Sequence, residues 1–318
     1  MARILHIEDL RVHFPINIGT VRAVEGANLT IEEGEVMGLV GESGCGKSTL
    51  GLSILRLLRP PGRIVGGKIF YHGEDIVRMG RKEILALRGG RIAMIFQDPL
   101  TSLNPLFSIK EHFIETLRTH EKRIETKEAL ARAERMLESL GISPERLHEY
   151  PHQMSGGMRQ RIMIGLGLIL NPDLLIADEP TTALDVIVEA QFLDLLDDLR
   201  KRFNLSIMLI THNLGNVAQL ADRISVMYCG TIVEAGPAQT IFDEPLHPYT
   251  QGLLASIPNI KLDEPELRLM RGSLPDLVSP PPGCVFHPRC PRAMDVCSEE
   301  WPKTAAVNGH QVNCWLYR

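Results

Sequence analysis

Residues 41–48 read Gly-Glu-Ser-Gly-Cys-Gly-Lys-Ser, the spacing G-x-x-x-x-G-K-[ST] of a phosphate-binding loop. A strand is predicted before it, at residues 35–40, and a helix after it, at residues 50–58. Glycines let the backbone curl so that N–H groups and the helix N-terminus point at phosphate oxygens. We therefore expect MgATP here, with Lys47 on the β- and γ-phosphates and the Ser48 hydroxyl on Mg²⁺. The expected contacts are Gly41, Ser43, Gly44, Cys45, Gly46, Lys47, Ser48 and Thr49.

Two carboxylates follow a second apolar run, at residues 174–177. Ligands of parallel sheets bind outside the carboxyl ends of the strands, where Asp178 and Glu179 are expected to lie. Asp178 is suited to hold Mg²⁺, directly or through water, and Glu179 to polarise the attacking water as general base. A solvated strand end is the alternative, and the phosphate-binding loop in the same chain makes it the weaker interpretation.

Further motifs follow in a fixed order along the chain. Ser155-Gly156-Gly157 opens a predicted helix and presents a hydroxyl and free N–H groups to an anion. Gln97 lies in Phe-Gln-Asp-Pro, Asp185 ends Ala-Leu-Asp, and His212 follows an apolar strand. Each motif alone is weak, but chance does not explain all of them together with the phosphate-binding loop.

The elements that must position these residues alternate between strands and helices. Apolar alternation predicts short strands within residues 5–31, and helical spacing of apolar residues predicts a helical insertion over about residues 110–140. Apolar runs at residues 174–177, 207–210 and 223–227 predict buried strands, with a helix at 188–203 between the first two. This order predicts an α/β fold with a mainly parallel sheet and helices on both faces.

The composition and charge of the chain argue against some classes of function. A formal net charge of −5 argues against a nucleic-acid partner, because such proteins usually present a basic face. No apolar run approaches the roughly 18–20 residues that cross a bilayer. The N-terminal residues lack the apolar core of a signal peptide, so we expect the protein to face the cytosol.

Past about residue 245 the chain becomes rich in proline and carries four of the six cysteines, which suggests a separate C-terminal module. Four thiols in an apparently cytosolic chain favour a metal site over disulfides. A tetrahedral sulfur set suits Zn²⁺ or an iron–sulfur cluster, and the absence of a C-x2-C pair weakens the zinc interpretation. Reduced, unliganded thiols remain the third alternative. The set is Cys284, Cys290, Cys297 and Cys314.

With these motifs in place, nearly the whole chain resembles the ATP-binding subunits of ABC transporters. The resemblance implies that Gln97 contacts Mg²⁺ and senses the membrane partner. It implies that Ser155-Gly156-Gly157 contacts the γ-phosphate of ATP held by the opposite subunit, that Asp185 lies at the dimer interface and that His212 contacts the γ-phosphate. Catalytic roles are thus expected for Glu179, His212 and Gln97, and Mg²⁺ contacts for Ser48, Gln97 and Asp178.

The sequence departs from the family pattern at two places. The signature reads Met-Ser-Gly-Gly-Met instead of Leu-Ser-Gly-Gly-Gln, so only the contacts of the serine and both glycines carry over. The aromatic residue that often stacks on adenine is replaced by Ile18, and Phe14 is a possible substitute.

The resemblance implies two domains. An ABC ATPase domain at residues 1–244 would combine a RecA-like core with an antiparallel β subdomain and a helical subdomain at about 98–168. A small Cys- and Pro-rich module would occupy residues 245–318. Longer runs are similar to the oligopeptide and dipeptide importers: IFQDPLTSLNP from residue 95, SGGMRQR from 155, DEPTTALDV from 178 and HPYT from 247. Some of these importers carry a [4Fe-4S] cluster on cysteines in a segment similar to residues 283–290.

We therefore predict the ATP-hydrolysing subunit of an importer of dipeptides or oligopeptides, peripheral to the cytoplasmic face of the membrane. Expected partners are a second ATPase subunit, either a copy or a paralogue, two membrane-spanning permeases and an extracellular binding protein. Nickel or oligosaccharide cargo is the main alternative. A soluble ABC protein acting on ribosomes or DNA would carry two cassettes or a long coiled coil, and a non-hydrolysing module would lack catalytic residues, so both are weaker.

Overall fold

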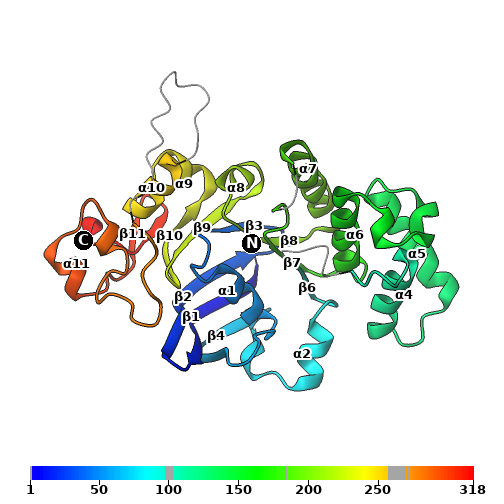
Figure 1. Cartoon of the computed structure of the whole chain (residues 1–318), viewed down its shortest axis with the longest axis horizontal. Coiled ribbons are helices and arrows are strands. Elements are labelled where there is room, and N and C mark those ends of the chain that lie inside the picture. Colours follow the sequence, from blue (N-terminus) through cyan, green and yellow to red (C-terminus); the bar gives the residue numbers. More distant parts are fainter. Residues whose placement is uncertain (1, 97–102, 183–184, 257–269, 271) are drawn as a thin grey trace. The chain divides into compact units, whose positions relative to one another are not determined.

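The computed structural model describes residues 2–96, 103–182, 185–256, 270 and 272–318 (Figure 1). The chain divides into two compact units. The first comprises residues 1–4, 32–34 and 79–209, and the second comprises residues 5–31, 35–78 and 210–318. The division falls within β8 (Ser206–Thr211), one of the buried strands predicted from the sequence. Both units contain strands and helices, which confirms the α/β class.

The second unit is built around β3 (Val36–Val40), in which every residue is buried. β3 pairs in parallel with β9 (Arg223–Tyr228), where Met37 lies opposite Arg223 and Val40 opposite Val226. Beyond β9 the sheet continues through antiparallel strands, in the order β10 (Thr231–Pro237), β12 (His310–Val312) and β11 (Ala305–Val307). Three helices of this unit are α1 (Lys47–Ile54), α8 (Leu214–Leu220) and α9 (Ala238–Asp243).

The antiparallel edge corrects the prediction of a mainly parallel sheet. β9 returns into β10 through Cys229 and Gly230, whose φ angles of 44° and 80° are those of a type I′ hairpin turn. Asn-Gly and Asp-Gly are the usual sequence signals for this turn, and neither is present. The sheet is therefore mixed, and its antiparallel part could not be seen in the apolar pattern.

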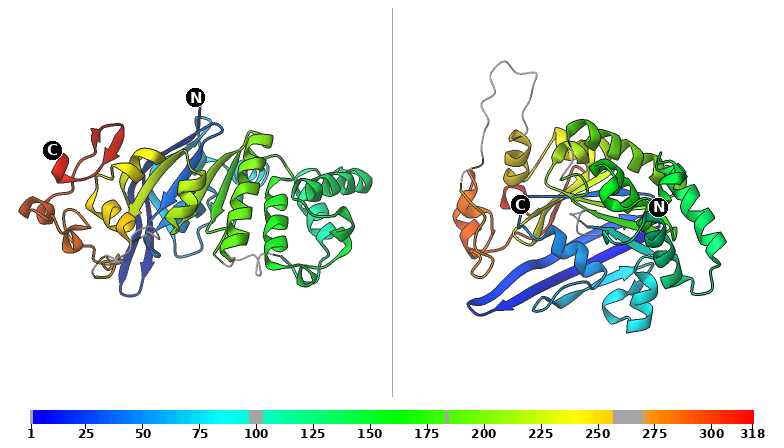
Figure 2. Two further views of the ribbon diagram at one scale, coloured as in Figure 1. Left: turned by 90° about the horizontal axis from the view of Figure 1, so that it is seen from above. Right: turned by 45° about the vertical axis from the view of Figure 1, so that its right-hand side comes forward.

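A second, four-stranded antiparallel sheet has the order β2-β1-β4-β5. Its two longest strands, β1 (Arg3–Ile16) and β2 (Gly19–Glu32), are longer than the predicted short strands and form the long blue ribbons of Figure 2. The register of β1 shifts between Glu8 and Arg11, and Asp9 between them has a φ of 45°. This bulge keeps Ile7 and Leu10 buried although they are three positions apart, so the alternation in the sequence is broken. The other two strands are β4 (Arg63–Tyr71) and β5 (Glu74–Asp75).

In the first unit, β6 (Ile92–Ile95) pairs in parallel with the fully buried β7 (Leu174–Asp178). The predicted helical insertion corresponds to α4 (Ile109–His120) and α5 (Thr126–Ser139), which contact α6 (Gly156–Leu168) (Figure 1). Gly165 of α6 allows a close approach to the end of α5, because a Cβ atom there would lie 2.6 Å from Leu140. The remaining α-helices described in this unit are α2 (Arg81–Leu87) and α7 (Val186–Phe203).

The C-terminal part of the chain belongs to the second unit. Its short helices are α10 (Pro248–Ala255), the 3-10 turn η4 (His287–Arg289), α11 (Asp295–Glu299) and the 3-10 turn η5 (Trp315–Tyr317). Glu234 of β10, fully buried, accepts hydrogen bonds from the backbone N–H groups of Leu246 and His247. The same carboxylate lies 3.0 Å from Nδ1 of the buried His310. The buried Glu234 side chain thus joins β10, residues 246–247 and β12. A domain boundary at residue 244 stays a prediction.

In the part of the chain that the structure describes, no helix combines the length and the apolar character needed to cross a bilayer.

Glu234→Ala tests this junction. The change removes the acceptor of the Leu246 and His247 N–H groups and the partner of the His310 ring, so we expect it to lower the free energy of unfolding of the second unit by about 2–4 kcal/mol. Both tryptophans, Trp301 and Trp315, lie in this unit, so their fluorescence during urea titration reports its unfolding. Glu299→Ala on exposed surface is the matched control and should unfold at the wild-type urea concentration. An unchanged midpoint for Glu234→Ala would show that the junction does not stabilise the unit.

Candidate active site

The predicted phosphate-binding loop connects β3 to α1 in the second unit. Gly46, at the N-cap of α1, has a φ of 108°, and a Cβ atom there would lie 2.1 Å from the carbonyl oxygen of Ala23. At Gly41 a Cβ atom would lie 2.2 Å from the carbonyl oxygen of Met227. Only glycine fits at these two positions, because neighbouring strands press against the loop from behind. The loop therefore has the tight turn into a helix N-terminus that phosphate binding requires.

Lys47 is buried at the mouth of this loop. Its Nζ donates hydrogen bonds to the carbonyl oxygens of Gly41 at 2.8 Å and Glu42 at 3.0 Å. The ammonium group is thus directed back across the loop, where phosphate oxygens could replace the carbonyl oxygens as its partners. The phosphate contacts of Lys47 stay a prediction, and the sequence did not indicate these carbonyl contacts.

Cys45 fills the inside of the loop. Its side chain is fully buried, and burial raises the pKa of the thiol, although the nearby Lys47 acts in the opposite direction. A protonated thiol inside a packed loop is a poor nucleophile. Cys45 therefore serves as a small packing residue.

The two predicted carboxylates lie at the end of β7 in the first unit, and both are buried. Glu179 has a φ of 45°, an unfavourable backbone conformation for a residue with a side chain. Thr182 supports it, since its hydroxyl donates to the Glu179 carboxylate at 3.1 Å and to the Glu179 carbonyl oxygen at 3.2 Å. Sequence reasoning did not identify Thr182, although a Thr three residues after an acid is a common local hydrogen-bonding pattern.

The first unit also brings the serine-glycine motif and Asp185 together. Ser155 is the N-cap of α6, where its hydroxyl accepts from the Met158 N–H at 3.3 Å. Asp185 is the N-cap of α7 and accepts from the Val188 N–H at 2.9 Å. The two helix starts line one groove of 340 Å³. The groove is lined by Ser155, Gly156, Gly157, Met158, Arg161, Asp185, Val188 and Gln191.

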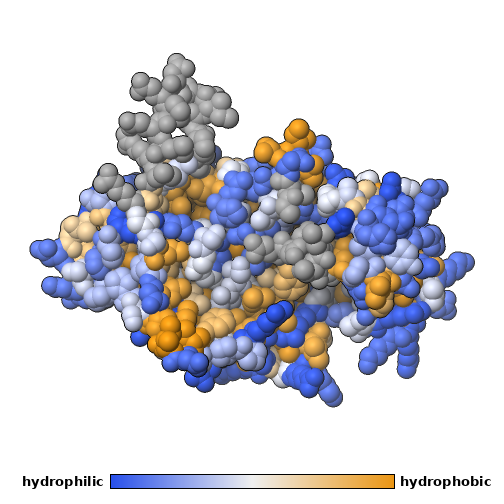
Figure 3. All heavy atoms as spheres, in the orientation of Figure 1, coloured by the Kyte–Doolittle hydropathy of each residue, from blue (hydrophilic) through white to orange (hydrophobic). Residues whose placement is uncertain are grey.

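This groove has the features of an anion site. Two helix N-termini carry partial positive charge, and Arg161 adds a full positive charge beside the carboxylate of Asp185. A Cβ atom at Gly156 would have no atom within 4 Å, so the backbone there is open to a ligand. Apolar surface gathers over α7 in Figure 3, where Val186 and Ile187 are 80% and 72% exposed. Neither Arg161 nor this apolar pair was singled out from the sequence.

The structure says less about the other residues that the sequence singled out. His212 is exposed directly after β8, beside Asn213, which caps α8. Gln97 lies outside the described residues. At the tip of the β1–β2 hairpin, Ile18 is 81% exposed, while the ring of Phe14 packs against Gly62. An adenine-stacking role for Phe14 stays a prediction.

The four C-terminal cysteines gather in the second unit without a bond between them. Burial raises the pKa of Cys284 to about 11, and the other three thiols contribute to the same rise. The pKa values of Cys290 and Cys314 are also raised, again mainly by burial. Burial therefore favours the protonated thiol at Cys284, Cys290 and Cys314. In the described part of the chain, no group of three or more His, Cys, Asp or Glu side chains is placed to hold a metal ion, so the predicted cluster site is not assembled here.

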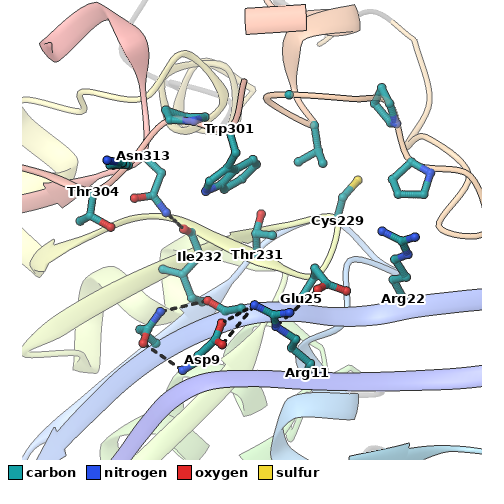
Figure 4. Close-up of a pocket in the computed structure, with 18 of the residues that line it drawn as sticks. Asp9, Arg11, Arg22, Glu25, Cys229, Thr231, Ile232, Trp301, Thr304 and Asn313 are labelled. Atoms are coloured by element: carbon teal, nitrogen blue, oxygen red, sulfur yellow. Dashed lines mark hydrogen bonds and ion pairs between the residues drawn. The ribbon is translucent and has the colours of Figure 1, made fainter. Parts of the chain in front are cut away.

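A larger cavity of 630 Å³ lies in the second unit, between strands β1, β2 and β10 and the C-terminal segment (Figure 4). Trp301 and a run of prolines form part of its wall. Part of its charged wall is paired, since Arg11 lies 3.1 Å from Asp9 and 3.6 Å from Glu25. The phosphate-binding loop is not among its lining residues, so this cavity is separate from the predicted ATP site.

Comparison with known proteins agrees with the geometry. Residues 24–182 match the family described as ABC transporter, and residues 233–297 match the oligopeptide/dipeptide transporter C-terminal region. The chain is 47% identical over 320 residues to the dipeptide transport ATP-binding protein DppD of Bacillus subtilis, covering 99% of this chain and 95% of that protein. It is 46% identical to the oligopeptide transport ATP-binding protein AppD of the same organism, covering 100% and 98%.

A solved structure supports the same conclusion for the fold. The dimeric structure of MJ0796, a bacterial ABC transporter cassette, covers 74% of this chain and 98% of its own, at 25% identity and a TM-score of 0.65. The ABC cassette fold is therefore confirmed, and so is the expectation of an ATPase. The chain belongs to the ABC transporter family, as an ATP-binding protein of the oligopeptide/dipeptide transporter type.

Proposed function

We propose that this chain hydrolyses ATP to drive the import of dipeptides or oligopeptides through partner permeases. The observation that carries the proposal is the phosphate-binding loop, which turns into α1 with Lys47 buried at its mouth. The peptide cargo is supported by the C-terminal match and by the relatives, which are named as dipeptide and oligopeptide transport ATP-binding proteins. Each of the remaining sites contributes a specific step.

ATP is held by the loop and by Lys47. Backbone N–H groups at the start of α1 face the phosphates, and the Lys47 ammonium exchanges its carbonyl partners for the β- and γ-phosphate oxygens. Ser48 and Asp178 supply hydroxyl and carboxylate oxygens, the donors that Mg²⁺ prefers, and Gln97 is the third proposed contact. Mg²⁺, when bound, neutralises charge that develops on the phosphates.

Glu179 acts as the general base. Its carboxylate accepts a proton from the attacking water, while the Thr182 hydroxyl at 3.1 Å keeps it in position. His212 is proposed to contact the γ-phosphate. The strained backbone of Glu179 supports its role as general base, because strained backbone conformations occur preferentially at functional positions.

The groove at Ser155–Gly157 and Asp185 is proposed to close over ATP that is bound by a second ATPase subunit, a copy or a paralogue. Two helix N-termini and Arg161 suit an anionic ligand, and the exposed Val186 and Ile187 suit a protein partner next to it. The solved cassette MJ0796 is itself described as dimeric. Closure around ATP and reopening after hydrolysis would move the permeases.

The proposed assembly contains two permeases and an extracellular binding protein, with this chain at the cytoplasmic face of the membrane. The permeases would contact the region from Gln97 to about residue 110. Nucleic acid is not expected as a partner, given the net charge of −5.

The four C-terminal cysteines are proposed as ligands of a [4Fe-4S] cluster, with Zn²⁺ as the alternative. The donor set fits either group chemically, because both accept four thiolates. Binding would require the buried thiols to lose their protons and to move into a common coordination geometry.

Glu179→Gln tests the general base. The amide cannot take a proton, so we expect ATP turnover to fall by about 10²- to 10⁴-fold while ATP binding persists. Steady-state assays of ATP hydrolysis with cognate permeases present would show the slow turnover. Light scattering would show the ATP-stabilised dimer. Glu138→Gln, on the exposed face of α5, is the matched control. Wild-type turnover in Glu179→Gln would remove Glu179 from this role.

Cys290→Ser tests the cluster in anaerobically purified protein. We expect wild-type protein to be brown and to contain about four iron and four sulfide per chain, both lost in the variant. Cys229→Ser, outside the proposed set, should keep them. Colourless wild-type protein with one zinc per chain, or with no metal, would rule the cluster out without affecting the ATPase assignment.

A further inference from the structure

Glu42, the second residue of the phosphate-binding loop, is held from three directions. Its N–H donates to the Tyr249 hydroxyl at 2.9 Å. Its carboxylate oxygens each lie 3.1 Å from Nη1 of Arg289. Its carbonyl oxygen accepts from Lys47, as described above. The loop motif places no requirement on this position, so these contacts are a property of this chain.

Arg289 reaches the loop from η4, 247 residues further along the chain. Its side chain is only 6% exposed, against 28% for Glu42. Besides Glu42 it contacts Tyr228, with Nη1 at 3.4 Å from the hydroxyl and the guanidinium carbon 5.8 Å from the ring centre. A buried charge with these partners has one defined position, so the ion pair is geometrically specific.

An aromatic cluster fixes both partners of Glu42. Tyr228, Tyr249 and Phe286 are almost completely buried, with ring centres 4.6 to 5.4 Å apart. Burial raises the pKa of both tyrosines, so their hydroxyls stay neutral. Phe286 precedes η4, and its carbonyl oxygen accepts from the Arg289 N–H at 3.0 Å. The three rings therefore tie α10 and η4 to the end of β9.

The charge of Glu42 makes this arrangement matter for nucleotide binding. A carboxylate on a loop that grips polyphosphate opposes the binding of that anion. Arg289 neutralises it, and together with Tyr249 it also fixes the peptide whose carbonyl oxygen holds Lys47. Loss of the pair would leave a negative charge and a less ordered loop at the phosphate site.

We propose that Arg289 and Tyr249 are positioning residues through which the C-terminal segment sets the affinity of the phosphate-binding loop for MgATP. The inference rests on the proposed ATP binding at this loop. It makes the region after residue 245 part of the nucleotide site, although none of its residues belongs to a nucleotide-binding motif.

Arg289→Met in the full chain tests the proposal. We expect the dissociation constant of a fluorescent ATP analogue with Mg²⁺ to rise about tenfold, with kcat for ATP in the assembled transporter changed less than twofold. Arg292→Met, which removes an exposed charge from the same segment, is the matched control and should bind as wild type does. Arg289→Lys keeps the charge but loses the planar guanidinium group that contacts Tyr228, and should fall between the two.

The double variant Glu42→Gln with Arg289→Met distinguishes loss of charge balance at the loop from general destabilisation of the protein. Removing the carboxylate as well removes the repulsion, so affinity should return towards the wild-type value. Tyr249→Phe keeps the ring packing and loses only the acceptor of the Glu42 N–H, so it should weaken binding about threefold even if Arg289→Met does not fold. Tryptophan fluorescence reports whether each variant is folded.

The outcomes discriminate between the proposals. Wild-type affinity in both Arg289→Met and Tyr249→Phe overturns the positioning role and leaves the ATPase assignment intact. A double variant no better than folded Arg289→Met overturns the charge argument on which the role depends. Wild-type protein that binds no MgATP contradicts both the assignment and this inference.

Discussion

A loop that binds phosphate must hold its backbone in the one conformation that directs N–H groups at the ligand, and its own glycines make it too flexible to do so alone. In this protein the constraint is met from outside. The carbonyl oxygens of Ala23 and Met227 press against Gly46 and Gly41, and the Gly230 N–H donates to the Cys45 carbonyl oxygen at 2.8 Å. The β1–β2 hairpin and the β9–β10 turn are thus structural supports of the ATP site.

Sequence predicted those features that are encoded locally. The buried strands β3, β7, β8 and β9 are short apolar runs, and α4 and α5 follow helical spacing, so each was found near its true position. The length of β1 was missed because the bulge at Asp9 interrupts its alternation. The antiparallel return at Cys229-Gly230 was missed because the turn lacks the usual Asn-Gly or Asp-Gly pair, and its hydrogen bond to the Cys45 carbonyl oxygen cannot be seen in the sequence.

For the candidate site as well, the sequence indicated only those residues that lie in continuous motifs. Spacing alone identified Lys47 and the acids at the end of β7, since both motifs are continuous in the chain. It could not show that Ser155 and Asp185 cap helices that start at one groove, because that depends on how α6 packs against α7. For the cysteines, spacing gives the donor types but not the positions of the sulfur atoms. Burial favours the protonated thiols, whereas a metal would favour thiolates, and the free energy of metal binding must exceed this desolvation cost.

The ion pair between Glu42 and Arg289 could not be predicted at all, because a variable motif position meets a residue 247 positions away. It nevertheless follows a simple physical rule. An acid beside a polyphosphate site is tolerated only when a cation faces it, and a cation that is itself buried needs a fixed partner. Glu42 and Arg289 therefore balance each other's charge, and the aromatic cluster holds both side chains in position. On this argument the C-terminal segment supplies the charge that balances the acid of the phosphate-binding loop.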